Sequence, residues 1–212
     1  RFGWSPSSLR YLGVNITPNP EDLYLNNYTR LLAELKGEMI RWARLPLSWT
    51  GRINTVKMTI LPKLLYVFYA LPVVVPMEFF RELKSAILRY IWKGAPARIS
   101  YRTLSLTKES GGWGLPEMRS YYRAAQLRIL VDWSARESSK PWVHMDRAVA
   151  GHALWDLVWL KKEHRTANVY ISTPTATMLR TWDVADVGGR LTTYPSPYTP
   201  IHLNPDFTPG MD

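Results

Sequence analysis

The sequence of 212 residues contains no cysteine, few acidic residues and no long apolar run. The absence of cysteine excludes disulfide scaffolds, cysteine-ligated zinc sites, iron–sulfur clusters and thiol catalysis. The uncharged stretch 64–77 is shorter than the ~20 residues that span a bilayer, and it contains Pro72 and Pro76. No secretory leader pattern opens the chain, which begins with Arg1. We therefore expect an intracellular protein and a piece of a longer one.

Positive charge is what the sequence has in excess. The chain carries 27 Lys and Arg against 17 Asp and Glu, a net charge of +10, and its 46% of hydrophobic residues exclude a disordered polyelectrolyte. Residues 1–133 hold 19 basic and 9 acidic residues, whereas residues 134–212 hold 8 of each. Such a field attracts polyanions, either nucleic acid or an acidic membrane surface. A solvated basic face without a partner has the same composition.

Hydrophobic periodicity predicts a mainly α-helical fold. Loose alternation and β-forming residues predict one short strand over 9–16. Apolar residues recurring every three or four positions predict amphipathic helices over 22–45, 49–71, 77–92, 117–135 and 147–166. Ser48 suits the N-cap of the second helix, and Pro62 is expected to kink or divide that helix. Residues 98–106 fit either a strand or a short helix.

The end of the chain has a different composition. From Thr173 onward, Thr and Pro dominate and no periodicity remains. We therefore expect residues 173–212 to be an extended or disordered, poorly structured tail. The predicted organisation is a strand region over 1–20, a helical domain over 21–135, a partial helical region over 136–172 and this tail.

Five blocks of sequence carry a resemblance to a known family. They are YLGV at 11–14, GRINTVKMTILPKLLYVF at 51–68, PMEFFRELKSAILRYIWKG at 76–94, ARIS at 97–100 and GGWGLPEMRSYYRAA at 111–125. In this order they resemble the region that follows the polymerase palm in LINE-type non-LTR retrotransposon reverse transcriptases. The resemblance covers about residues 10–135. It implies that a palm-like strand region is followed by a helical thumb-like bundle and the start of the next domain.

The resemblance implies a polymerase part without the active site. The family's Tyr-x-Asp-Asp turn has no counterpart, since the only neighbouring acidic pair is Glu21-Asp22. Polymerisation needs two metal ions held by carboxylates, so we expect no catalytic residue, metal site or cofactor in this chain, and Mg²⁺ in the intact polymerase.

The resemblance also implies partners for the chain. The expected role is non-specific binding of an RNA–DNA or RNA duplex, which supports RNA-directed DNA synthesis by the rest of the reverse transcriptase. By family resemblance this role is performed in cytoplasm and nucleus, with no membrane partner. The alternative is a degenerate or domesticated retroelement remnant that acts as a protein-interaction module.

Seven basic residues are predicted to contact phosphates. They are Arg52, Lys57, Lys63, Arg41, Arg44, Lys93 and Arg98. The first three lie in the block that resembles the family best, and an ideal helix places Arg52 and Lys63, eleven residues apart, on nearly the same face. The alternative for each residue is a side chain that lies along the protein surface with its charge in water.

Two further patterns favour ordinary packing over function. His152 and Asp156 have the i,i+4 spacing of a helical metal-ligand pair, but one pair is far short of a closed coordination sphere. The aromatic residues could stack on bases, yet at helical spacing most are expected to be buried. The ones considered are Trp49, Trp92, Trp113, Tyr121 and Tyr122.

Overall fold

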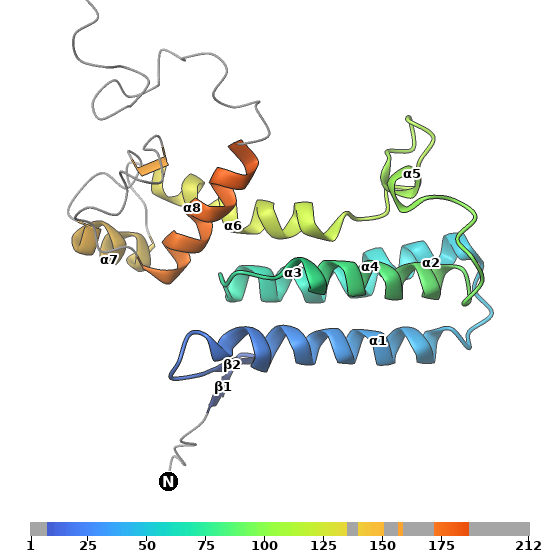
Figure 1. Ribbon diagram of the computed structural model, residues 1–212, viewed down its shortest axis with the longest axis horizontal. Helices are drawn as coiled ribbons and strands as arrows, with labels where there is room; N and C mark the ends of the chain where they lie inside the picture. The colour runs from blue at the N-terminus through green and yellow to red at the C-terminus, as the bar shows by residue number, and fades with distance from the viewer. Residues whose placement is uncertain (1–7, 135–139, 151–156, 159–171, 187–212) are drawn as a thin grey trace, which may run out of the picture. The chain divides into compact units, whose positions relative to one another are not determined.

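The computed structural model describes residues 8–134, 140–150, 157–158 and 172–186, and these residues are mainly α-helical (Figure 1). The predicted fold class is therefore confirmed. The elements are β1 (Leu9–Tyr11), β2 (Val14–Ile16), the π-helical η1 (Tyr24–Thr29), α1 (Arg30–Trp42), α2 (Trp49–Thr55), the π-helical η2 (Val56–Ile60), α3 (Leu61–Ala70), α4 (Met77–Ile91), α5 (Tyr101–Ser105), α6 (Met118–Ser134), α7 (Pro141–Ala150) and α8 (Thr173–Asp186). The chain divides into two compact units, unit 1 over 1–122 and unit 2 over 123–212, with the division inside α6.

Residues 9–16 form an antiparallel hairpin rather than the single strand that was predicted. Leu9 pairs with Ile16, and the chain reverses at Leu12 and Gly13, whose φ angles are 46° and 85°. Two successive positive φ angles give a tight turn whose twist matches that of the flanking strands. The alternation of residue types indicates extended chain, but it does not show the reversal at Leu12 and Gly13.

The second predicted helix is confirmed as a continuous helical segment from Trp49 to Ala70. Ser48 is its N-cap, because its side-chain oxygen accepts a hydrogen bond from Gly51 N at 3.1 Å. Pro62 does not divide the segment. The π-helical η2 ends two residues before Pro62, the second residue of α3, so the departure from α-helical hydrogen bonding lies in the turn that precedes the proline.

The core of unit 1 lies between three helical segments, and α4 packs against both α1 and α2. Each segment contributes one buried apolar stripe, and each fully buried large side chain stabilises the fold by ~1.5–3 kcal/mol. The stripes are Tyr28, Leu32, Leu35 and Met39 on η1 and α1, Ile53, Val56, Ile60, Leu64 and Phe68 on the second segment, and Phe79, Leu83, Ile87 and Ile91 on α4. These stripes follow the predicted periodicity.

The loop after α5 folds back tightly at Gly112. Residues 98–106 contain the short helix α5, whose N-cap is Ser100. A Cβ at Gly112 would lie 2.1 Å from the carbonyl oxygen of Leu106, whereas a Cβ at Gly37 in α1 would meet nothing within 4 Å. The two glycines therefore differ in the space around them.

We expect Gly112→Ala to lower the free energy of unfolding by about 1–3 kcal/mol, because the loop must shift to admit the methyl group. Gly37→Ala should raise it by about 0.5–1 kcal/mol, since alanine is the better helix former and the position is open. Urea unfolding followed by circular dichroism measures both changes. Shifts of the same sign for the two variants would contradict this account.

Burial also makes the stability of unit 1 sensitive to alkali. Burial raises the pKa of Tyr28 and of Tyr101 above the usual value, and their hydroxyls donate to Leu71 O at 3.0 Å and Pro116 O at 2.6 Å. The unfolded chain loses these phenolic protons above pH ~10 while the folded chain keeps them. The free energy of unfolding should fall above pH ~10, by up to ~1.4 kcal/mol per pH unit for each tyrosine.

Urea titrations at pH 9 and pH 11 measure this fall. The free energy of unfolding of Tyr101→Phe should decrease less between pH 9 and pH 11 than that of the parent chain, although the variant is less stable at pH 9. Tyr11, which is 60% exposed, gives the control Tyr11→Phe, whose fall should equal that of the parent. If the free energy of unfolding decreases equally in all three proteins between pH 9 and pH 11, groups other than Tyr101 cause the decrease.

Unit 2 corrects the predicted tail. The segment Thr173–Asp186 is helix α8, in which Met178 and Leu179 are buried. Ser172 Oγ accepts from Thr175 N at 3.4 Å, and Pro174 occupies the first turn, where proline is tolerated. A composition of Thr and Pro therefore does not exclude a helix here. Residues 187–212 lie outside the described residues.

The core of unit 2 joins α6, α7 and α8. Its buried members are Leu130, Trp133, Val143, Leu157, Val158, Met178 and Leu179. Trp182 Nε1 donates to Val158 O at 3.0 Å, and Thr175 Oγ1 donates to Asp146 Oδ2 at 2.8 Å. The predicted helix over 147–166 overlaps α7 at 147–150, and residues 157–158 form a 3₁₀ turn. The rest of that prediction lies outside the described residues.

Candidate nucleic-acid interface

Arg52 is buried, so its predicted role as a phosphate contact is wrong. Its side chain is 0% exposed. Nη1 donates to Tyr90 O at 2.6 Å, Nη2 to Ala43 O at 3.0 Å and Leu45 O at 3.4 Å, and Nε to Leu47 O at 3.3 Å. The last carbonyls of a helix have no partner within the helix and carry partial negative charge. Arg52 therefore binds the C-terminal ends of α1 and α4 and fixes them side by side.

Lys57 and Lys63 are also engaged within the chain. Lys57 Nζ donates to Trp113 O at 2.5 Å, which ties η2 to the loop that precedes α6. Lys63 Nζ lies 2.5 Å from Glu38 Oε1 and 3.7 Å from Glu34 Oε1. A phosphate would have to compete with these carboxylates for Lys63. Both lysines therefore already have partners within the chain, which a phosphate would have to displace.

The other four predicted contacts are exposed. Arg41 lies in the last turn of α1, Arg44 follows two residues after its end, and Lys93 and Arg98 follow the end of α4. None of the four has an ion-pair partner among the residues that the structure describes. Lys93 has a φ of 54° and precedes Gly94 in the turn that ends α4. These side chains are therefore available to an anion in solvent.

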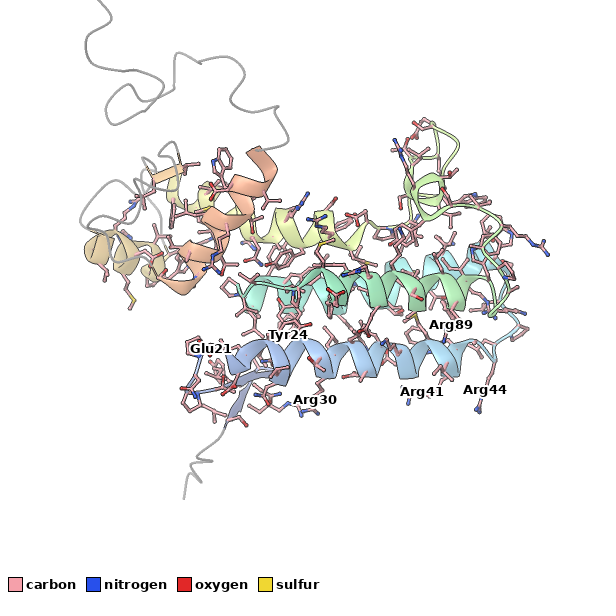
Figure 2. The ribbon with its side chains drawn as sticks, viewed as in Figure 1. Glu21, Tyr24, Arg30, Arg41, Arg44 and Arg89 are labelled. Carbon is pink, nitrogen blue, oxygen red and sulfur yellow. The ribbon has the colours of Figure 1, made fainter. Side chains whose placement is uncertain are left out.

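A row of three arginines lies along the outer side of α1 and of the turn that follows it. Figure 2 shows Arg30, Arg41 and Arg44 on the side of α1 that faces away from the other helices of unit 1. Arg30 and Arg41 are eleven residues apart, which turns an α-helix to within about 20° of the same direction and advances it ~16 Å. We call Arg30, Arg41 and Arg44 the basic row.

Two exposed arginines of unit 1, Arg30 and Arg89, were not among the predicted contacts. Arg30 shares its face with Arg41, and the eleven-residue spacing in the sequence was a usable signal for it. Arg89 is exposed in the last turn of α4, where it follows the buried Ile87 by two positions and so points away from the core. Its position on the polar face of α4 would have predicted that Arg89 is exposed.

The aromatic residues were expected to be mostly buried, and this is correct for Tyr122 alone of the five. Trp113 is 38% exposed and Tyr121 is 40% exposed. The Trp49 ring stacks on Trp92, with centroids 5.7 Å apart, and meets Trp113 edge-on at 4.9 Å. The three tryptophans pack on one another and are only partly covered by the rest of unit 1.

No family model matches the chain. The assignment of a function therefore depends on the chemistry of its own residues. In the described part of the chain, no three His, Asp or Glu side chains are placed to hold a metal ion. The pair His152 and Asp156 lies outside the described residues. Among the helices that the structure describes, none has the length and apolar character to cross a membrane.

Proposed function

We propose that the chain is a non-catalytic part of a LINE-type reverse transcriptase that binds template–primer nucleic acid. The ligand is an RNA–DNA or RNA duplex, held through its phosphates, and the chain supports RNA-directed DNA synthesis carried out in cytoplasm and nucleus by the rest of the polymerase. The basic row on α1 is the single observation that carries this proposal. Two exposed guanidinium groups lie ~16 Å apart on one face of α1, and the third, that of Arg44, follows two residues after the end of the helix. They have no acidic partners among the described residues, so each can bind a phosphate.

The geometry supports binding without sequence readout. The planar guanidinium group of arginine donates two parallel hydrogen bonds to phosphate oxygens. Contacts of this kind position a protein on a duplex without reading its bases. An A-form duplex offers a wide, shallow minor groove bordered by phosphates and 2′-hydroxyls. Catalytic carboxylates and their Mg²⁺ ions would come from the remainder of the polymerase.

Salt dependence of binding tests the proposal. A fluorescein-labelled RNA–DNA hybrid is titrated with the full chain at several KCl concentrations, and binding is followed by fluorescence anisotropy. If the three arginines of the basic row neutralise three phosphates, log K should fall with log[KCl] at a slope of about −2 to −3. The affinity would then drop by about 40-fold between 50 and 200 mM KCl. A flat response over this range would overturn the proposal.

A further inference from the structure

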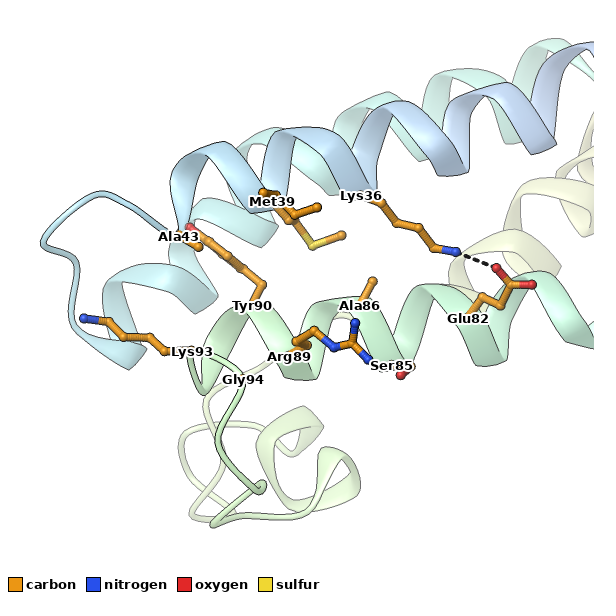
Figure 3. A pocket seen from close by; sticks show the side chains of 11 residues that line it. Lys36, Met39, Ala43, Glu82, Ser85, Ala86, Arg89, Tyr90, Lys93 and Gly94 are labelled. Atoms are coloured by element: carbon orange, nitrogen blue, oxygen red, sulfur yellow. Dashed lines mark hydrogen bonds and ion pairs between the residues drawn. The ribbon is translucent and has the colours of Figure 1, made fainter.

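An apolar groove runs between α1 and α4 in unit 1. Its volume is about 570 Å³, and Figure 3 shows its lining side chains extending from the two helices. Met39 and Ile40 come from α1, Ala43 directly follows it, and Ala86 and Tyr90 come from α4. Ile40 is 65% exposed. Apolar surface of this kind gains free energy when a ligand or partner covers it.

The two ends of the groove differ in charge. At one end Lys36 Nζ lies 2.5 Å from Glu82 Oε2 (dashed line in Figure 3), so the charges of this pair neutralise each other. At the other end are Arg89 and Lys93, which are exposed and have no ion-pair partner within the described ranges. The groove therefore combines an apolar floor with a net positive end.

The dimensions of the groove suit a helix. Small side chains at Ala43, Ser85 and Ala86 line it and leave room for the ridge of another helix, which packs with its axis ~8–10 Å from its neighbours. The α4 side of the groove extends from Glu82 to Lys93, which is ~16 Å, or about three helical turns. Two or three large apolar side chains at i, i+4 and i+7 of a docked helix would fill this length.

We propose that this groove binds an amphipathic helix of a partner protein, with apolar side chains on one face and acidic side chains that meet Arg89 and Lys93. Charge complementarity selects the acidic partner, because the groove's own glutamate is already paired with Lys36. A polyanion such as RNA gains nothing from the apolar floor. The basic row is separate from it, since neither Arg41 nor Arg44 lines the groove. Duplex and helix can thus bind the chain at different faces.

A designed peptide tests this inference on the full chain. The probe is an 18-residue fluorescein-labelled helix with leucines at i, i+3, i+4 and i+7 spacing and glutamates on the flanks, and the comparison peptide has lysine in place of each glutamate. Fluorescence anisotropy measures binding. We expect the glutamate peptide to bind at least tenfold more tightly than the lysine peptide.

Two groove variants and one matched control localise the binding. Ala86→Leu fills the groove without changing charge and should weaken binding of the glutamate peptide at least tenfold. Ala124→Leu makes the same substitution at an exposed alanine of α6. This control should bind the glutamate peptide as tightly as the parent chain does. The double variant Arg89→Glu with Lys93→Glu changes exposed side chains only, so it should fold, and it should remove the preference for the glutamate peptide.

The outcomes separate this inference from the proposed function. No binding of the glutamate peptide, or equal binding to the parent chain and to Ala86→Leu, overturns the inference. Displacement of the peptide by duplex RNA, together with loss of RNA binding in Ala86→Leu, would assign the groove to nucleic acid and also overturns it. Loss of RNA binding in variants of the basic row, with peptide binding intact, leaves the inference standing.

Discussion

Replacing Arg52 with methionine is expected to lower the free energy of unfolding of unit 1 by about 3–5 kcal/mol. The substitution keeps much of the buried volume of the side chain but removes every donor. Ala43 O, now bound at 3.0 Å, would lose its Arg52 donor, and Tyr90 O, now bound at 2.6 Å, would keep only the weaker bond from Lys93 N at 3.4 Å. Buried carbonyls without a hydrogen bond are costly. The C-terminal ends of α1 and α4 would also lose the charge that favours their proximity.

Hydrogen exchange in the full chain measures this loss at the amides of α1 and α4. Arg41→Met is the matched control, because the same substitution at an exposed position should change the stability by less than about 0.5 kcal/mol. Arg52→Lys should fall between the two, since a lysine keeps the charge but lacks the planar fork that reaches several carbonyls at once. If the amides of α1 and α4 are equally protected from exchange in Arg52→Met and in Arg41→Met, then Arg52 does not hold the two helix ends together.

Arg52 also shows where sequence reasoning failed for the site. Its position in a basic, family-like block favoured a phosphate contact, and the eleven-residue spacing to Lys63 suggested a shared face. That spacing crosses η2, whose π-helical turns contain more residues than α-helical turns, so the α-helical rotation does not apply. Arg52 also precedes Val56 by four positions, which places it beside the buried stripe. This signal was present in the sequence.

The same spacing argument succeeds where the helix is uninterrupted. Arg30 and Arg41 both lie in α1, which has no π-helical residues between them, and they share the outer side (Figure 2). The helix positions were predictable for a related reason, because each buried stripe repeats with the α-helical period. Long-range partners have no such local signature. The ion pair of Lys63 with Glu38, 25 residues away, could not be read from spacing.

Composition was a weaker guide than periodicity. The dominance of Thr and Pro predicts an extended or disordered tail over 173–212, and this range includes helix α8. In the structure, Thr181 Oγ1 donates to Thr177 O at 2.9 Å, so this threonine satisfies its hydroxyl on the helix backbone while Met178 and Leu179 enter the core of unit 2. Tertiary burial therefore overrides the low helix propensity of threonine.

Reversing the charge of two residues of the basic row is expected to weaken duplex binding by about 10–100-fold at 100 mM KCl. The variant is Arg41→Glu with Arg44→Glu. Two phosphate contacts are lost and two repulsive carboxylates are added, so the salt slope should become shallower by about 2. Both side chains are exposed and have no ion-pair partner in the described part of the chain, so folding should not change. Anisotropy titrations of the RNA–DNA hybrid measure both quantities.

A second double reversal separates a local contact from the effect of net charge. Arg102→Glu with Lys108→Glu changes the net charge by the same amount at exposed residues of α5 and the loop after it. If the basic row holds the duplex, this control should weaken binding several-fold less than the α1 variant and should leave the salt slope nearly unchanged. Equal losses in the two variants would mean that the duplex responds to the overall field of the protein. The basic row would then have no special place in binding, and the proposal that α1 lies against the phosphates would fail.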